Sequence, residues 1–519
     1  MKVGTTFELT TQIIEKARNT GITDLVFHKM HVSIEKSALQ GFHLHDTGKL
    51  SSDGKNYAFL KVKSQLEAIE VKVPRIFNYD SYNLREAMIK DMYWSLIIDN
   101  LIEQKCIEIA GPHVHFIHLD KHSNYFSDVM KFFFRLIKSI PVSTGIAPHS
   151  GLKNRLALRI NSVKGIAFYG KLLSTLGAGR HFVYQSFLAD RANETAAAVQ
   201  SQGFENIRFN YKKRVFYDET WKFLKAFFKT DTRFLNLVID TKRKLVTVVT
   251  ELERMAESEI HGILLCAGEN EGEGLVSGMV AKKYSVKSFN FMNGTKTNDY
   301  INGLTNFDVW FMHDLRMQKM IMSLAHKSEE SLPITGHLLE DVAKEHHYAG
   351  TLDDWWEKIE GKKIIALFSS TTYNVEQLDV ENLLIEVLNE VPDALVLARL
   401  HPGDKHSIPF THERMILLPD FKERSAPALF DLLQLSHIAI SFGSTVSLQA
   451  TWFGIPSVSF EFSEKSLLLY ADQEKVHHFN NTDKLHSFLL QKLREPKVLP
   501  HHIQGEKSVA QKMTEILLH

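Results

Sequence analysis

Two loops in the last quarter of the sequence carry residue types that bind anions. The first runs from Arg399 to Asp404, and the second is the stretch 441–445, Ser-Phe-Gly-Ser-Thr. Each follows an apolar run typical of a buried strand, at 394–398 and 437–441. Small hydroxyl residues and a glycine at a helix start direct backbone N–H groups toward an anion, and a histidine adds a charge-assisted hydrogen bond. The pattern predicts a nucleotide-phosphate site that contains His401, Pro402, Ser441, Gly443, Ser444 and Thr445.

A third loop of the same kind follows the apolar run 363–368. It reads Ser-Ser-Thr-Thr and adds Ser370 and Thr371 to the predicted site. One serine-rich turn has little weight, because serine and threonine are common helix caps. Three such loops, each after a strand of one domain, favour a phosphate site over helix capping.

Strands alternate with helices from residue 181 onward, which predicts parallel, doubly wound sheets. Strands are expected at 181–185, 207–211, 260–266, 286–292 and 308–312, and helices at 190–202, 220–256 and 275–284. A second α/β series starts at Lys363, after a polar junction at 351–361. The predicted fold class is α/β, with two Rossmann-like domains at 181–350 and 351–519 and an additional N-terminal α/β module.

The N-terminal module, residues 1–128, is expected to contain a strand within 23–32 and a long helix over 83–105. Its stretch 43–46, His-Leu-His-Asp, combines an acid with two bases. We expect a surface turn there, because Gly48 follows. Regulatory, acceptor-binding and partner-binding roles stay open for this module.

The connecting segment, residues 129–180, has an unusual charge pattern. No Asp or Glu occurs from Val129 to Ala189, whereas nine Lys or Arg residues stand there among large apolar residues. Such a mixture suits a segment that lies on an anionic membrane surface. Helices packed against an acidic neighbouring surface would show the same pattern, so both interpretations stay open.

The composition argues against several classes of protein. The 61 Lys and Arg residues balance the 61 Asp and Glu residues, and this zero net charge argues against a nucleic-acid partner. Cys106 and Cys266 are too few for a disulfide framework or a cysteine-based metal site. The chain starts without the apolar core of a signal peptide, and it has no run of about eighteen apolar residues. We expect a cytoplasmic protein, with peripheral contact to the inner membrane face as an option.

The region from about Ile364 to Phe462 resembles the nucleotide-binding half of GT-B glycosyltransferases. Within it, 399–402 resembles the His-Pro motif and 442–445 the Ser/Thr motif of bacterial sialyltransferases and Kdo transferases, in which the two motifs hold the phosphate of a CMP-sugar. The resemblance covers about 181–519 and includes 290–294 and 334–336. Many UDP-sugar enzymes of this fold carry a ribose-binding glutamate where this chain has Gln449 and Ala450, which weakens a UDP-sugar assignment.

The resemblance also implies a carboxylate base in the domain that precedes. The stretch 269–274, Glu-Asn-Glu-Gly-Glu-Gly, is similar in character to the family's acidic motif. Glu271 is the first candidate and Glu273 the second, with Glu269 beside them. Such a base must come within about 2.6–3.2 Å of the acceptor hydroxyl. Acidic residues are also favoured at any helix start, so a structural role stays open for each glutamate.

The expected activity is therefore inverting transfer of a sugar from a nucleotide donor, best a CMP-nonulosonic acid or CMP-Kdo, to a glycan or glycolipid hydroxyl in surface-polysaccharide synthesis. The nucleotide sugar is a co-substrate, and no cofactor is expected. His401 and the Ser444–Thr445 loop would offset the charge of the leaving group, so no metal ion is required. The alternatives are a nucleotide-sugar 2-epimerase, a UDP-sugar or CDP-glycerol transferase, and a non-catalytic glycan-assembly subunit.

Overall fold

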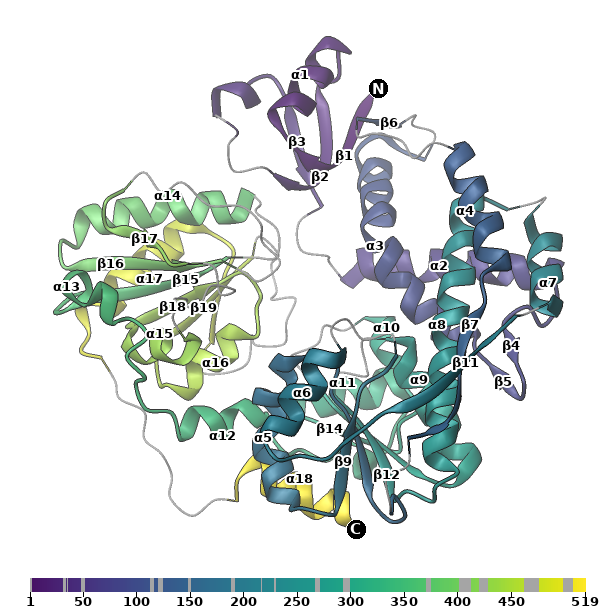
Figure 1. Cartoon of the computed structure of the whole chain (residues 1–519). Helices are drawn as coiled ribbons and strands as arrows, with labels where there is room; N and C mark the ends of the chain where they lie inside the picture. Colours follow the sequence, from purple (N-terminus) through teal and green to yellow (C-terminus); the bar gives the residue numbers. More distant parts are fainter. Residues whose placement is uncertain are drawn as a thin grey trace. The chain divides into compact units, whose positions relative to one another are not determined.

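The computed structural model describes residues 2–30, 34, 36–47, 52–112, 116–119, 125–147, 151–187, 192–215, 217–227, 230–266, 271–292, 299–369, 375–400, 412–419, 428–461, 476–497 and 507–519. The chain divides into two compact units (Figure 1). Unit 1 comprises Met1–Gly54, Ile98–Lys121 and Val342–Glu506, and unit 2 comprises Lys55–Ile97, His122–Asp341 and Lys507–His519.

Unit 2 is built on a six-stranded parallel sheet. Its strands are β8 (Leu156–Arg159), β9 (His181–Tyr184), β10 (Asn206–Ile207), β12 (Gly262–Cys266), β13 (Lys287–Phe291) and β14 (Val309–Phe311). They lie in the order β10-β9-β8-β12-β13-β14, which is the strand order of a Rossmann fold. The carboxyl ends of these strands therefore meet at one edge, and the order reverses between β8 and β12.

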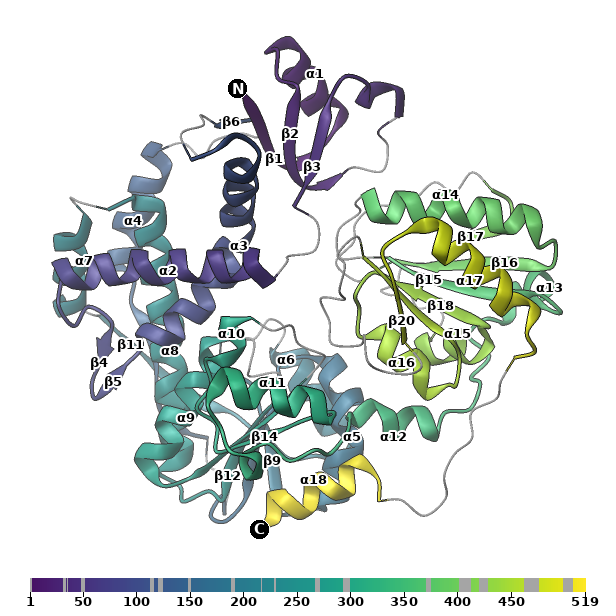
Figure 2. The same cartoon turned by 180° about the vertical axis from the view of Figure 1, so that it is seen from behind.

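Helices cover both faces of this sheet. On one face, α5 (Val163–Leu176), α6 (Ala192–Ser201) and the C-terminal helix α18 (Val509–Leu518) share an apolar core with the strands. Helix α18 starts with a capping box of Ser508 and Gln511. On the other face, α9 (Gly272–Tyr284) packs on β12 and β13, and α8 (Thr232–Ala256) packs on α9 (Figures 1 and 2).

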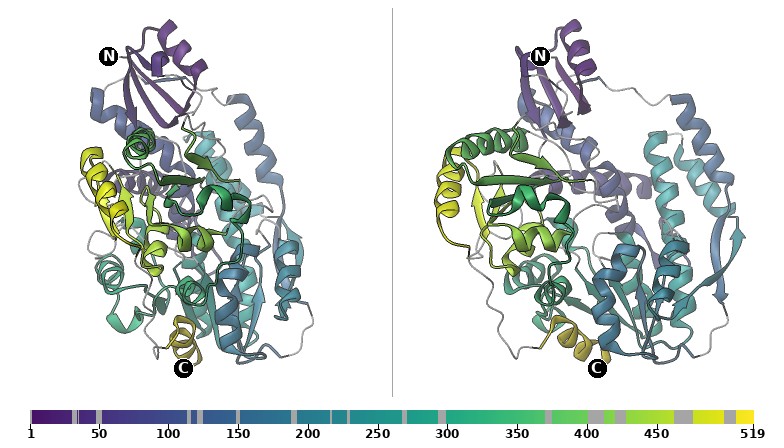
Figure 3. Two further views of the ribbon diagram at one scale, coloured as in Figure 1. Left: turned by 90° about the vertical axis from the view of Figure 1, so that its left-hand side faces the viewer. Right: turned by 60° about the vertical axis from the view of Figure 1, so that its left-hand side comes forward.

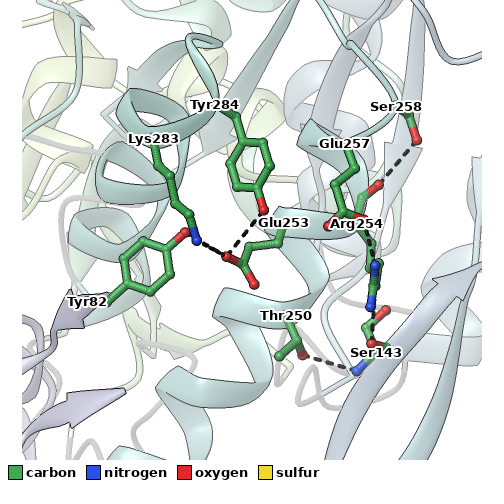
Figure 4. Close-up of polar contacts among 9 residues, drawn as sticks. All are labelled: Tyr82, Ser143, Thr250, Glu253, Arg254, Glu257, Ser258, Lys283 and Tyr284. Atoms are coloured by element: carbon green, nitrogen blue, oxygen red, sulfur yellow. Dashed lines mark hydrogen bonds and ion pairs between the residues drawn. The ribbon is translucent and has the colours of Figure 1, made fainter. Parts of the chain in front are cut away.

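Helix α8 connects several parts of unit 2, as Figure 4 shows. Its Glu253 carboxylate accepts hydrogen bonds from the Tyr82 hydroxyl and from the Lys283 ammonium of α9, each at 2.8 Å. On another side, the Thr250 hydroxyl accepts from the backbone N–H of Ser143 at 3.1 Å. Ser143 lies in β7 (Ile140–Ile146), which pairs antiparallel with β11 (Phe209–Arg214) in a two-stranded ribbon beside α8 (Figure 3).

Unit 1 contains a second sheet of the same order. Strands β15 (Lys363–Phe368), β16 (Ala394–Arg399), β17 (Met415–Leu417), β18 (Ile438–Ser441), β19 (Ser457–Phe460) and β20 (Val476–Phe479) are arranged as β17-β16-β15-β18-β19-β20, all parallel. Helices α14 (Val375–Glu390) and α17 (Thr482–Arg494) share one core with the strands, and α15 (Leu429–Leu435) and α16 (Val446–Trp452) share another. The predicted α/β class with two Rossmann-like domains is confirmed.

The N-terminal module has a four-stranded parallel sheet in the order β3-β2-β1-β6, formed by β1 (Val3–Leu9), β2 (Asp24–Met30), β3 (His43–Asp46) and β6 (Phe116–His118). The prediction of a surface turn at 43–46 is wrong, because this stretch is an edge strand. Cross-strand contacts explain the difference: His45 Nε2 lies 3.0 Å from the Asp24 carboxylate on β2. Helix α3 (Arg85–Ala110) covers the predicted long helix.

Three stretches depart from the expected elements. The expected helical stretch 220–256 is divided between α7 (Tyr217–Phe227) and α8, which begins after its N-cap residue Asp231. The stretch 129–180, expected to connect domains, contains most of α4 (Tyr125–Ile137) and all of β7, β8 and α5, and β8 is an inner strand of the first sheet. The expected single strand 207–211 is wrong, because it divides near Arg208 between β10 in the sheet and β11 in the ribbon. Among the described residues, no helix has the length and apolarity that crossing a bilayer requires.

Helix α9 approaches α3 at a glycine. A Cβ atom on Gly272 would overlap the backbone oxygen of Ala87 on α3, whereas a Cβ on Gly170 in α5 would have its nearest neighbour at 3.9 Å. We expect Gly272→Ala to lower the free energy of unfolding by about 1–3 kcal/mol, because the backbones must separate. Gly170→Ala, the matched control, should raise it by up to about 1 kcal/mol. Urea midpoints would measure both, and equal midpoints for the two variants would contradict the close packing.

Candidate functional site

A buried ion pair marks the carboxyl edge of the first sheet. Arg159 is the last residue of β8, and Glu273 lies in the first turn of α9, directly after the loop that follows β12. The guanidinium and the carboxylate form an ion pair, and both side chains are almost completely buried. Burial raises the pKa of Glu273, and the charge of Arg159 opposes that shift. The pair fixes the start of α9 against the strand at which the sheet order reverses.

Glu271 precedes this turn in a different environment. It is the N-cap residue of α9, its backbone is extended, and its side chain is 47% exposed. Its carboxylate lies 3.4 Å from the Lys244 ammonium of α8. Glu271 therefore presents a charged oxygen to solvent from a fixed position, whereas Glu273 is enclosed.

Asp91 of α3 holds the same helix start from the other side. One of its carboxylate oxygens accepts the backbone N–H of Gly272 at 2.6 Å, and the other lies 3.1 Å from Lys244. Burial raises the pKa of Asp91, although Lys244 and the N–H of Gly272 oppose the shift. Burial opposes the charge of Lys244, but Asp91 and Glu271 raise its pKa. Asp91, Lys244 and Glu271 form a network that joins three helices.

This network lines an open hollow of about 640 Å³. Trp94, whose side chain is 44% exposed, adds an aromatic surface to the hollow. The remaining lining comes from α3 and α8 and consists of Ser95, Asp240 and Thr241. A hollow of this size that combines an aromatic ring with ionised and hydroxyl side chains suits a small polar ligand.

A further carboxylate, Glu251, lies deeper in α8 and is 1% exposed. It accepts hydrogen bonds from the Tyr211 hydroxyl at 2.6 Å and from the backbone N–H of Phe187 at 2.8 Å. Burial raises the pKa of Glu251 to about 7, although both hydrogen bonds oppose the shift. Phe187 follows β9, so Glu251 secures the chain where it leaves the sheet next to the Arg159 strand.

The glutamates of the predicted acidic stretch 269–274 thus lie in different environments. Glu271 is accessible in the hollow, Glu273 is buried in an ion pair, and Glu269 lies outside the described residues. The Glu271 carboxylate can contact an acceptor from its present position. The Glu273 carboxylate could do so only if its ion pair with Arg159 were broken.

In the second sheet, three predicted loops start at one edge. Phe368 at the end of β15 is in register with Arg399 of β16 and Ser441 of β18. The loops that hold Ser370 and Thr371, and His401 and Pro402, begin there but lie outside the described residues. The strand ends therefore bring together the starting points of the loops, as parallel pairing requires.

The described loop 441–445 is held by serine contacts. The Ser441 hydroxyl lies 2.6 Å from that of Ser447, and both are buried. Gly443 has a positive φ of 56° and donates its N–H to the Ser459 hydroxyl at 3.2 Å. Ser444 and Thr445 are half-buried at the start of α16, where the Thr445 side chain forms no capping bond. Ser441 and Gly443 thus shape the loop, and Ser444 and Thr445 are its more accessible members.

Four residues of the site were not predicted from the sequence: Asp91, Arg159, Lys244 and Glu251. The charged residues of α3 and α8 alternate with apolar ones in the way that a solvent-exposed helix face does, so the sequence does not distinguish them. One feature of the sequence could have drawn attention to Arg159: it ends a short apolar run in a stretch that contains no acidic residue. Its partner is distant in sequence, and only the fold shows it.

The sequence matches no protein-family model and no curated protein. Solved structures with a similar course include the UDP-GlcNAc 2-epimerase from Neisseria meningitidis bound to UDP-GlcNAc, with 10% identity, a TM-score of 0.46, and coverage of 70% of this chain and 94% of that one. The glycotransferase of kitacinnamycin has 13% identity, a TM-score of 0.43 and coverage of 72% and 95%. The wall teichoic acid polymerase TagF has 12% identity, a TM-score of 0.36 and coverage of 71% and 83%. The likeness concerns the fold alone.

The raised pKa of Glu251 predicts a pH-dependent stability. Its pKa is about 7 in the folded chain and 4.5 without burial, so the folded state holds the proton more tightly. The contribution of Glu251 to the free energy of unfolding is fully present below about pH 4.5. It decreases as the pH rises to about 7, and the total decrease is up to about 3 kcal/mol. Glu251→Gln should remove this part of the slope in urea titrations between pH 5 and pH 7.5, which bracket most of the change.

Glu257→Gln is the control for that titration, because Glu257 is exposed at the end of the same helix. Its stability profile should follow that of the unchanged chain. A Glu251→Gln profile parallel to that of the unchanged chain would contradict the raised pKa.

Proposed function

We propose that this chain is an inverting glycosyltransferase in which Glu271 is the general base. The donor is a nucleotide-linked sugar, best a CMP-linked nonulosonic acid or Kdo. The acceptor is the hydroxyl of a glycan or glycolipid, bound in the hollow beside Glu271.

The position of Glu271 carries the proposal. Its carboxylate is half exposed at the carboxyl edge of a Rossmann-like sheet, where such folds bind ligands. Lys244 and Asp91 fix it on a helix start, and the hollow that it lines has the volume of a small-ligand pocket. Trp94 offers an aromatic face with polar groups nearby, which suits the apolar face and hydroxyl rim of a sugar ring.

The chemistry follows from this geometry. The Glu271 carboxylate takes the proton of the acceptor hydroxyl while that oxygen attacks the anomeric carbon of the donor. The new C–O bond forms as the bond from the anomeric carbon to the nucleotide phosphate breaks on the opposite face, so the configuration inverts. Lys244 keeps the carboxylate oriented, and the buried Arg159–Glu273 pair holds the helix that carries it.

The donor phosphate is assigned in this proposal to the carboxyl edge of the second sheet. The common edge of β15, β16 and β18 supports the assignment, because all three strands lead into hydroxyl- or histidine-containing loops. Ser444, Thr445 and His401 would stabilise the charge on the departing nucleotide without a metal ion. Gln449 and Ala450 are both buried, and neither offers a carboxylate for ribose hydroxyls.

Glu271→Gln should lower the rate of nucleotide release from CMP-N-acetylneuraminic acid, in the presence of a lactose acceptor, by about 10²- to 10⁴-fold, because the amide cannot accept the proton. CMP affinity should stay unchanged. Glu273→Gln should instead lower stability by about 3–5 kcal/mol, since it leaves Arg159 buried without its partner. Glu257→Gln is the control, because Glu257 is exposed at the C-terminal end of α8, far along the helix from Lys244. Full activity of Glu271→Gln would refute the assignment of the base.

A calorimetric panel of CMP, CDP, UDP and GDP tests the donor site. CMP should bind best, and at about 100 times its Kd it should stabilise the chain by about 2.7 kcal/mol. Thr445→Val should weaken binding, whereas Thr451→Val should not, because the Thr451 hydroxyl is bonded within α16 to the Leu448 carbonyl. Binding of none of the four would favour a non-catalytic subunit. Conversion of a free nucleotide sugar without acceptor would favour a 2-epimerase.

A further inference from the structure

Helix α4, Tyr125–Ile137, turns an apolar stripe toward solvent. The five exposed residues of the stripe are Phe126, Met130, Phe133, Phe134 and Ile137. At about 100° per residue these positions fall within an arc of about 100°, so they form one continuous face. Phe126 is 69%, Phe134 64% and Ile137 71% exposed, which is unusual for large apolar side chains gathered on one helix.

The opposite face of α4 already accounts for the packing of the helix. Phe132 is buried and stacks on Phe227 of α7 (Tyr217–Phe227) at a ring distance of 4.7 Å. Asn236 of α8 donates a hydrogen bond to the backbone oxygen of Asp128 at 2.9 Å. The packing of α4 within unit 2 thus rests mainly on the face opposite the apolar stripe.

Helix α7 adds to the exposed surface beside α4 (Figures 1 and 2). Trp221 is 61% exposed, and the Lys225 ammonium lies 5.4 Å from the centre of its ring. Phe133 of the stripe contacts Phe227 of the same helix at 5.8 Å between ring centres. An aromatic ring with a lysine beside it is typical of side chains at the boundary between lipid and water.

The charges around the stripe are mainly positive. Lys131 is exposed on α4 and Lys138 is exposed directly after its last residue, Ile137. Lys212 and Lys213 are exposed on β11, whose pairing with β7 places them beside Val142 and Pro141. Three nearby acids are paired: Asp128 lies 3.4 Å from Lys131, Asp240 of α8 lies 2.6 Å from Arg135, and Glu219 of α7 lies 3.0 Å from Lys222. No Asp or Glu occurs in the sequence from Val129 to Ala189, which includes most of α4 and all of β7.

We infer that the α4 stripe, together with Trp221 and the surrounding lysines, docks this protein on an anionic lipid surface. The apolar residues enter the headgroup region, and Lys131, Lys138, Lys213 and Lys225 contact lipid phosphates. Helix α4 is about 20 Å long and lies flat on the bilayer in this arrangement. The inference does not depend on the proposed transfer reaction.

Flotation of the full chain with vesicles tests the inference. The chain should float with vesicles of equal parts phosphatidylcholine and phosphatidylglycerol, and not with phosphatidylcholine alone. Phe134→Ser with Ile137→Ser should weaken binding about tenfold or more, because two large side chains no longer enter the lipid. Lys138→Glu with Lys213→Glu should weaken it at least about fivefold per lysine, and added salt should weaken binding of the unchanged chain.

Matched control variants distinguish binding through this surface from nonspecific binding to vesicles. Val71→Ser removes an 83% exposed apolar residue of α2 (Ser52–Lys72), and Lys319→Glu changes an exposed lysine of α11 (Leu315–Ala325). Both should leave flotation unchanged. Equal binding of all variants, or no binding to anionic vesicles, would overturn the inference. So would a fall in oligomer size of the stripe variant in sedimentation, which would show that a second copy covers the stripe. CMP binding, measured in parallel, reports on the transfer site alone.

Discussion

The carboxyl edge of the first sheet depends on a buried pair of charges, Arg159 and Glu273. Removing two ions from water costs several kcal/mol each, and the cost is offset only when the ions meet with good geometry. The pair joins the end of β8 to the first turn of α9. Once this turn is fixed, Asp91 binds its backbone and Lys244 binds the residue before it. The accessible carboxylate is thus supported by a buried ion pair, by the nearly buried Asp91 and by Lys244, whose side chain is 34% exposed.

Three glutamates near this edge show how environment divides roles among identical side chains. Glu273 compensates a buried cation, Glu251 accepts two hydrogen bonds in the interior, and Glu271 reaches the hollow. Only a group with access to both solvent and a fixed support can exchange a proton with a bound hydroxyl. Of the candidates that the acidic stretch suggested, the structure thus makes the second, Glu273, a structural residue and leaves the first, Glu271, accessible.

The sequence predicted what is local and failed where partners are distant. Apolar runs at 363–368 and 437–441 predicted two inner strands of the second sheet, and the predicted helix 275–284 lies within α9, which begins three residues earlier at Gly272. Strand β8 was missed because it has four residues and ends in an arginine that looks exposed until Glu273 is placed beside it. Strand β3 was missed because its alternating polar residues resemble a turn, although Asp24 on the neighbouring strand binds one of them. Asp91 and Lys244 could not be identified, since their contacts join separate helices.

The proposed transfer site and helix α4, which carries the apolar stripe, both contact α8. Asp240 lines the hollow and also forms the ion pair with Arg135 of α4, one turn of α8 before Lys244. The hollow therefore opens close to the helix whose other side bears exposed phenylalanines. A free oligosaccharide gains nothing from such proximity, whereas an acceptor whose sugar is attached to a lipid would be held by both surfaces at once. The effective concentration of its hydroxyl near Glu271 would then be set by the membrane and not by solution. Under the two proposals taken together, this arrangement favours a glycolipid over a soluble glycan as the acceptor.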